Sequence, residues 1–240
     1  MTTLTTIPKH CLQLIVGHLT NERDLRALRT ASKRLTKATP EPGTRSLEVK
    51  DNSSEVLPRL KRQKLLPYVK KLNISWCVKV TDISDLAGIQ ELDMSYCFNV
   101  YDISALKGIK KLNMTYCMEV KDISALAGIE ELTMSRCDSV TNLSALAGIK
   151  KLDMSCCYNI TDVSALKGIE VLDMSFCTQV TDLNDLAGIK ELNITECTRI
   201  TDVSMLAGLK KLTIGEEQEL EGIEELKQAG CEIVHWEPNN

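Results

Sequence analysis

The sequence repeats itself every 20 residues over most of its length, and this period limits the possible folds more than any other feature. A complete unit reads IKKLDMSCCYNITDVSALKG, from Ile149 to Gly168. Short fixed periods of this kind are typical of solenoids, in which each unit buries its apolar face against its neighbours. The period is marked by a cysteine column at Cys77, Cys97, Cys117, Cys137, Cys157, Cys177 and Cys197.

Each unit contains a leucine followed two residues later by methionine or isoleucine, as in Leu152 and Met154. Because side chains alternate between the two faces of a β-strand, both of these apolar groups point to the same side. Each unit is therefore predicted to contain a short strand whose two apolar side chains face the core. Stacked units then give a parallel sheet of about eight regular strands, about 34 Å long at the usual strand spacing.

Glycine and aspartate recur at fixed places in the second half of the unit. The glycine follows a short apolar turn and suits a left-handed backbone conformation that returns the chain to the next strand. The aspartate, with a serine two residues later, is a natural cap for that turn. We interpret both as structural, because paired catalytic carboxylates would not recur once per unit. The aspartate column is Asp82, Asp102, Asp122, Asn142, Asp162, Asp182 and Asp202.

The chain has ten cysteines but no CxxC pair, and its three histidines are scattered. These spacings do not predict a zinc site or another metal site, and no motif points to a cofactor. The start of the chain, MTTLTTIPKH, lacks the pattern of a secretory signal, so we expect an intracellular chain with free thiols. The cysteine column is predicted to be buried, with weak hydrogen bonds from its thiols to carbonyl groups. Cys156 lies outside that column and is a candidate reactive thiol.

The whole pattern, LxxLxLxxCxxhxDhSxLxG, resembles the leucine-rich repeat. The cysteine followed by I-T-D is similar to the cysteine-containing class, and D-I-S-x-L is similar to the short internalin-like repeats. The resemblance extends from Val69 to Gly215. It implies an α/β solenoid, a right-handed coil with a parallel β-sheet on its concave face and short turns on its convex face.

One column varies from unit to unit where the others agree. Trp and Tyr at these positions, with Phe98, Tyr101 and Tyr158 nearby, place seven of the nine aromatic residues near one edge of the sheet. Because Trp, Tyr and Arg dominate binding hot spots, we interpret this edge as a surface for a target protein. The alternative is that the rings only cover the edge of the coils. We call this set the exit column: Trp76, Tyr96, Tyr116, Arg136, Cys156, Phe176 and Glu196.

Two polar columns lie beside the exit column, one with Asn73 and Asp93 and the next with Ser75 and Ser95. Their side chains are small, so we expect them to leave the floor of the sheet open to a partner. A third column alternates lysine and glutamate between neighbouring units, beginning with Lys71 and Glu91. Opposite charges on adjacent strands neutralise one another.

Residues 1–40 break the repeat and have helical apolar spacing. The order I-P-x3-L-x2-I-x3-L-x4-DL-x2-L-x3-SKRL resembles the F-box, a three-helix module. The resemblance implies that Ile7, Pro8, Leu12 and Ile15 contact a Skp1-type adaptor. A generic helical cap on the solenoid would show the same spacing, and this alternative stays open. Two positions depart from the F-box pattern: Ile7 replaces the usual leucine, and Leu35 replaces the usual aromatic residue.

The remaining segments are interpreted as ends of the solenoid. Residues 41–68 are predicted to form a linker and an irregular N-terminal cap, with a first strand at 47–49. Residues 69–215 are the regular repeats. Residues 216–240 are predicted to form a C-terminal cap, an acidic helix that stops at Gly230 and a last strand.

An F-box joined to cysteine-containing leucine-rich repeats resembles the substrate receptors of SCF-type (Skp1–cullin–F-box) ubiquitin ligases. The resemblance implies a cytoplasmic or nuclear protein that does no chemistry and holds a target near the ligase. The alternative is a leucine-rich-repeat binding scaffold without a ubiquitin role. The net charge of −4 does not favour nucleic acid as a partner, and no apolar run is long enough to predict a membrane span.

Overall fold

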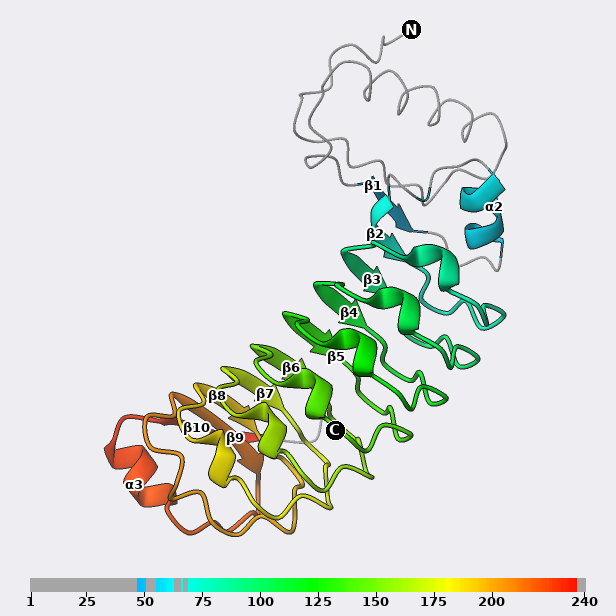
Figure 1. Ribbon diagram of the computed structural model, residues 1–240. Coiled ribbons are helices and arrows are strands. Elements are labelled where there is room, and N and C mark those ends of the chain that lie inside the picture. The colour runs from blue at the N-terminus through cyan, green and yellow to red at the C-terminus, as the bar shows by residue number, and fades with distance from the viewer. Residues whose placement is uncertain (1–46, 51–54, 63–65, 67–68, 237–240) are drawn as a thin grey trace, which may run out of the picture.

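The computed structural model describes residues 47–50, 55–62, 66 and 69–236. The described chain is a solenoid whose strands form one sheet, in which each strand pairs in parallel with the next one along the sequence (Figure 1). The ten strands are β1 (Leu47–Lys50), β2 (Val69–Asn73), β3 (Glu91–Asp93), β4 (Lys111–Asn113), β5 (Glu131–Thr133), β6 (Lys151–Asp153), β7 (Val171–Asp173), β8 (Glu191–Asn193), β9 (Lys211–Gly215) and β10 (Glu232–Trp236).

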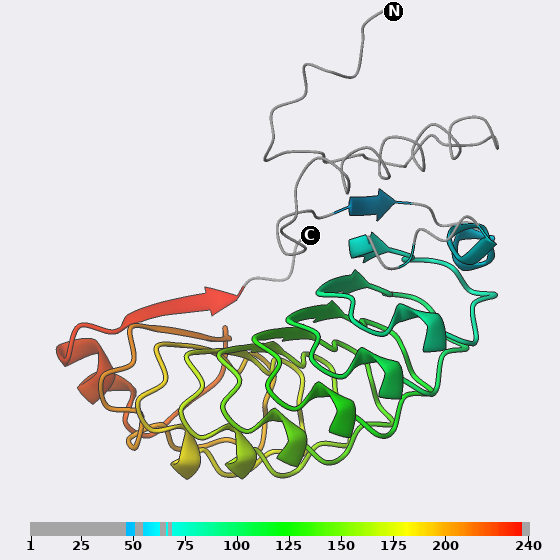
Figure 2. The same cartoon turned by 45° about the horizontal axis from the view of Figure 1, so that its top comes forward.

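Short 3-10 helices lie on the side of the coils opposite to the sheet. Figure 2 shows the strands side by side on the inner face of a gently curved molecule and these helices on its outer face. The expected arrangement of strands and short turns is therefore confirmed. The helices are η3 (Ser84–Leu86), η4 (Ser104–Leu106), η5 (Ser124–Leu126), η6 (Ser144–Leu146), η7 (Ser164–Leu166) and η8 (Asn184–Leu186).

The strands from β2 to β9 pair in strict register, so that each residue faces the residue 20 positions later. Leu132 pairs with Leu112 on one side and with Leu152 on the other. Every column of the sequence is therefore a continuous row of side chains. The leucine and methionine columns are buried in one core that runs the length of the solenoid, as predicted.

The turn between strand and 3-10 helix is fixed by the aspartate column. The Oδ1 atom of Asp82 accepts a hydrogen bond of 2.8 Å from the backbone N–H of Ser84, the first residue of η3. The same bond recurs in each of the seven units, and in the fourth unit Asn142 replaces aspartate with the same 2.8 Å distance. The glycine column then takes φ between 81° and 86°, as its role in the return to the strand requires.

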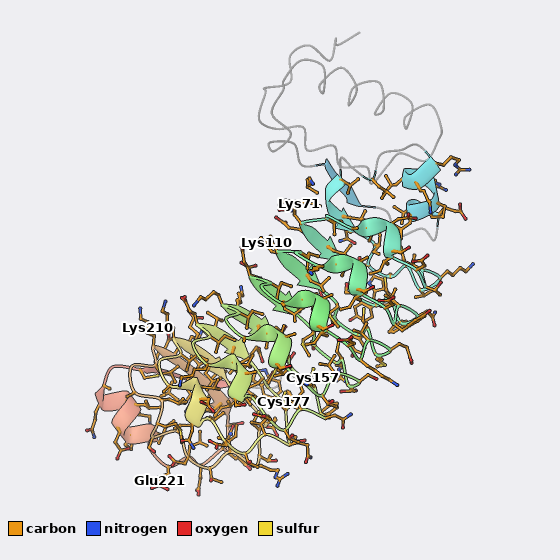
Figure 3. The ribbon with its side chains drawn as sticks, viewed as in Figure 1. Lys71, Lys110, Cys157, Cys177, Lys210 and Glu221 are labelled. Carbon is orange, nitrogen blue, oxygen red and sulfur yellow. The ribbon has the colours of Figure 1, made fainter. Side chains whose placement is uncertain are left out.

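The cysteine column lies inside the coils and forms a second ladder. Each thiol from Cys97 to Cys197 donates a hydrogen bond to the carbonyl oxygen 23 residues earlier, as in Cys137 Sγ to Met114 O at 3.0 Å. Cys157 and Cys177 mark this ladder in Figure 3. All nine described cysteines are free, and the column is buried as predicted. Burial raises the pKa of the Cys97, Cys117, Cys157 and Cys197 thiols to about 12.

Different elements close the two ends of the described sheet. At the N-terminal end β1 pairs with β2 with a register irregularity at Leu47, and α2 (Val56–Arg62) buries Val56, Leu57 and Leu60. At the C-terminal end α3 (Ile223–Gln228) buries Leu226, and β10 follows Gly230, whose φ is 90°. The F-box-like residues 1–40, and most of the predicted linker, lie outside the described residues.

The serine and threonine column of the sheet floor is less accessible than the polar columns beside it. Ser95, Ser175 and Thr195 are buried, and Ser75, Thr115, Ser135 and Ser155 are half-buried. Their hydroxyl groups turn back to the preceding polar column, as in Ser95 Oγ to Asp93 Oδ1 at 2.7 Å. Local hydrogen bonding of this kind is a general property of serine and threonine, and here it removes these groups from solvent.

The buried thiols predict a loss of stability in alkali. Folded Cys117 keeps its proton to a pKa of about 12, whereas the unfolded thiol ionises near 9.0. The thiol contribution is therefore complete below about pH 9 and decreases above it by about 1.4 kcal/mol per pH unit for each thiol. In urea unfolding under reducing conditions, Cys117→Ala should show a correspondingly shallower decline between about pH 9 and pH 10.5. A decline equal to that of the parent chain would contradict this assignment.

Candidate functional site

The exit column occupies a backbone conformation that its residue types normally avoid. All seven residues have positive φ, between 56° and 64°, in the left-handed region. A residue with a Cβ atom is destabilised there by about 1–2 kcal/mol, and glycine, asparagine or aspartate is the usual occupant. None of the seven positions has one of these residues.

The left-handed conformation follows from the path of the chain at the end of each strand. The backbone N–H of Trp76 donates to Ser95 O at 2.9 Å and so extends the pairing with the next coil. The backbone N–H of the next residue, Cys77, donates to Ile74 O at 3.0 Å, and the chain turns back into the core. The chain therefore bends sharply at the exit column. Its side chains form a row across the coils beside the buried cysteine column.

The first three rings of the exit column stack face to face. The ring centroids of Trp76 and Tyr96 are 3.9 Å apart with an interplanar angle of 7°, and those of Tyr96 and Tyr116 are 4.8 Å apart at 18°. These distances match the spacing of neighbouring strands, because equivalent positions in adjacent coils repeat at about 4.8 Å. Such aromatic pairs contribute about 0.5–1.5 kcal/mol each beyond their buried area.

Arg136 continues the stack into the fourth coil. Its guanidinium carbon lies 5.4 Å from the centroid of the Tyr116 ring, within the range of a cation–π interaction. The structure thus brings four of the seven exit-column residues into one continuous row of contacts.

A second column widens this row into an apolar patch. Phe98 meets Tyr96 edge to face at 6.0 Å, while Val78 and Met118 occupy the equivalent positions in the coils on either side. Val78 is 41 % exposed and Met118 is 39 % exposed. Neither residue is predicted from the sequence to belong to the site, although the column reads Val, Phe, Met in the first three units before Asp138. We call this set the apolar patch: Trp76, Val78, Tyr96, Phe98, Tyr116 and Met118.

The middle of the exit column is polar. Cys156 is half-buried, and the proximity of its thiol raises the pKa of the exposed Tyr158 hydroxyl group. The electrostatic influence of Cys156 in turn raises the pKa of Arg136 above its ordinary value. The three residues form one cluster, with the Tyr158 backbone held by Asp138 at 3.3 Å. The reactivity of Cys156 stays a prediction.

The far end of the exit column meets the C-terminal strand. The ring of Phe176 contacts Trp236 of β10 edge to face, with centroids 5.9 Å apart at 89°. The position of Trp236 at this edge could not be predicted from the sequence, because Trp236 lies beyond the repeat and no period relates it to Phe176. Glu196 has no ring contact within the described chain.

The concave floor is polar and largely paired with itself. A shallow hollow of about 410 Å³ lies over β2 to β5 and is lined by lysine, glutamate, asparagine and aspartate. Lys71 pairs with Glu91 at 2.7 Å and Lys111 with Glu131 at 2.9 Å, which confirms the predicted alternation of charge. Among residues 47–50, 55–62, 66 and 69–236, no three His, Cys, Asp or Glu side chains are grouped to hold a metal ion. Within the same ranges no helix is long and apolar enough to cross a membrane.

No family model matches the sequence, and no curated protein matches it. Solved structures do match. The toll-like receptor TLR13 in its complex with ssRNA13 gives a TM-score of 0.50 at 19 % identity, over 73 % of this chain and 29 % of that chain. The fold is of the leucine-rich-repeat type.

Two further leucine-rich-repeat proteins are similar over more of their own length. An internalin (InlF) from Listeria monocytogenes gives a TM-score of 0.48 at 17 % identity, over 80 % of this chain and 72 % of that chain. The leucine-rich-repeat domain of the type III effector XopL gives 0.41 at 16 % identity, over 91 % of this chain and 85 % of that chain. At these identities the similarity concerns the fold alone.

Backbone strain in the exit column can be measured at Glu196, which is exposed and outside the ring stack. We predict that Glu196→Gly is more stable than Glu196→Ala by about 1 kcal/mol, because only glycine lacks the Cβ penalty at positive φ. Urea denaturation of the two variants provides the measurement. At the exposed strand residue Lys151 the order should reverse, with alanine more stable than glycine. Equal stabilities of the Gly and Ala variants at position 196 would contradict the assigned strain.

Proposed function

We propose that this protein is a non-enzymatic binding scaffold that holds a partner protein on its exit column and apolar patch. The observation that carries the proposal is the use of Trp, Tyr, Arg and Phe at positions where the backbone favours glycine or asparagine. A chain selected only for stability would place small residues there. Stability lost at surface positions is a common consequence of function.

The exposure of the rings supports binding over the alternative that they only cover the coil edge. Trp76 is 57 % exposed, so most of its surface is not used to shield the core. The rings stack on one another, and this mutual contact holds them in place before any partner arrives. Ordered aromatic side chains bind with a small loss of conformational entropy, which is one reason why they dominate hot spots.

The recurrent polar residues support a binding role over catalysis. The aspartate column is engaged with the backbone of the next turn, and the polar column at 73, 93 and 113 is engaged with the adjacent serine or threonine. These side chains serve the coil in every unit. We propose no cofactor and no nucleic-acid partner.

The binding surface can be tested by changing Trp76, Tyr96 and Tyr116 together to alanine. We predict that a partner captured by the full chain, identified and purified, binds this variant at least about tenfold more weakly, since central aromatic anchors often contribute 2 kcal/mol or more each. Isothermal titration calorimetry measures the affinity. The matched control changes Lys110, Lys150 and Lys190, exposed at the opposite end of the strands, to alanine. Unchanged binding by the ring variant, with its fold intact by circular dichroism, would overturn the proposed surface.

We propose further that the protein is a substrate receptor of an SCF-type ubiquitin ligase in the cytoplasm or nucleus. The support is the F-box-like motif in residues 1–40, in which Ile7, Pro8, Leu12 and Ile15 would contact a Skp1-type adaptor. In that arrangement the repeats present the target to the ligase and raise its local concentration. A leucine-rich-repeat scaffold with a helical cap and no ubiquitin role is the alternative.

The two roles predict different results with purified Skp1-type adaptor. If the motif acts as an F-box, the full chain should retain the adaptor in a pull-down, and changing Leu12 and Ile15 to Asp should abolish retention, because a carboxylate cannot be buried in an apolar contact without a partner. The same variant should still bind the target protein through the repeats. Absence of adaptor binding by the unmodified chain would contradict the ligase role and leave only the scaffold role.

A further inference from the structure

We infer that the partner presents a basic segment, rich in arginine or lysine, to the apolar patch. This inference rests on the proposed function and adds the chemical class of the partner. Its basis is an uneven distribution of charge between the two halves of the coils, summed over the seven units, together with a guanidinium that the stack already binds.

Taken together over the seven units, the halves of the coils that contain the exit column are strongly acidic. Over residues 73–82 and their equivalents in the next six units, 12 Asp and Glu residues stand against four Lys and Arg, a net charge of −8. The other halves, from 83–92 to 203–212, contain seven Asp and Glu against nine Lys, a net charge of +2. Figure 3 shows Lys71, Lys110 and Lys210 along the opposite edge of the sheet, where the strands begin. The exit column therefore lies in the half that is acidic in sum, and the three coils of the stacked rings contribute a net charge of −3 to it, from five Asp and Glu against two Lys.

Carboxylates flank the rings on both sides. In each unit the polar column precedes the exit column by three residues, and in the second, fifth and sixth coils it contributes Asp93, Asp153 and Asp173. The aspartate column follows the exit column by six residues. Asp82 is four residues beyond Val78, which limits their separation along the chain to about 14 Å, and adjacent Tyr101 and Asp102 are both exposed. A ligand on the patch can thus lie within about 14 Å of the Asp82 carboxylate, a distance at which a screening length of about 8–10 Å weakens the attraction and does not abolish it.

Asp82, Asp102 and Asp122 keep their charge over a wide range of pH. The hydrogen bond from the serine N–H lowers the pKa of Asp82, Asp102 and Asp122 below the ordinary value. In each carboxylate one oxygen accepts this hydrogen bond, and the side chain is exposed to solvent. The column is therefore available to a cation even under mildly acidic conditions.

The ring stack itself shows which cation it accepts. Arg136 occupies one end of the stack, 5.4 Å from the centroid of Tyr116. At the other end of the stack, Tyr96 provides the only ring that Trp76 contacts within the described chain, and Trp76 is 57 % exposed. Indole is the best acceptor of a cation among the aromatic side chains. An arginine of the partner placed against Trp76 would complete the stack as Arg136 does at its other end.

The test separates charge from fold by means of a substitution that the protein already contains. Asn142 makes the same 2.8 Å turn bond as its aspartate counterparts. Changing Asp82, Asp102 and Asp122 to Asn therefore removes three charges next to the patch and retains the turns. The matched control makes the same change at Asp162, Asp182 and Asp202, two coils or more away from the patch.

The probe is a displayed library of random twelve-residue peptides selected on the immobilised full chain at about 0.15 M salt. We expect the selected peptides to be enriched in Arg and Lys relative to the library. Synthetic copies, measured by fluorescence anisotropy, should bind the proximal Asn variant about tenfold more weakly and the distal control within about twofold of the parent chain. Added salt should weaken binding to the parent chain and have less effect on the proximal variant.

Selected peptides that are neutral or acidic, or a library that yields no basic enrichment, would overturn the inference. So would basic peptides that bind the proximal variant as well as they bind the parent chain. The variant with Trp76, Tyr96 and Tyr116 changed to Ala separates this failure from failure of the proposed function. Peptides that require the rings for binding but lack basic residues would support the proposed surface and contradict the charge inference. Peptides that bind equally well without the rings would contradict both the proposed surface and the charge inference.

A synthetic peptide of residues 1–46 has eight Lys and Arg against three Asp and Glu. If it bound more tightly than the selected peptides, the basic segment that occupies the apolar patch would be the chain's own N-terminal segment.

Discussion

In-register parallel pairing is the constraint on which the rest of this structure depends. Each residue from β2 to β9 faces the residue 20 positions later, so every column of the sequence becomes a row of side chains at the spacing of the strands. A slip of one residue would turn the buried Leu132 and Met134 outward along with their whole columns. The rows of thiols, aspartates, ion pairs and rings all follow from this one register.

The repeat places its polar groups where they serve the coil. The cysteine column uses a weak donor to satisfy a carbonyl of the previous coil, as Cys137 does for Met114, and otherwise packs as a small apolar group. The aspartate column satisfies the first N–H of the next turn. The serine column is turned back on its own strand and is partly buried. Few polar groups in the regular columns are left for chemistry, and the variable exit column is where the chain differs from coil to coil.

The exit column combines a backbone constraint with a free choice of side chain. Geometry forces positive φ at each of its seven positions, because the chain must leave the strand and bury the next cysteine. Nothing in the coil requires a large side chain there. The stack of Trp76, Tyr96, Tyr116 and Arg136 is therefore the surface that we propose a partner recognises, and it lies in the halves of the coils that are acidic in sum. In the proposed complex, binding by the aromatic rings and attraction by the carboxylates act on the same face.

Much of this architecture could be predicted from the period alone, since a 20-residue unit leaves room for one strand and one short turn. The buried columns, the glycine and aspartate turns, the free thiols and the composition of the exit column are all local or periodic properties. The tertiary structure decided what depends on side-chain direction and on contacts outside the period. It showed the positive φ of the exit column, the burial of Ser95 and Ser175, and the widening of the ring row by Val78 and Met118. It also brought Trp236 to Phe176, a contact between the cap and the repeat that no periodicity encodes, because only the folded path of β10 sets the distance between them.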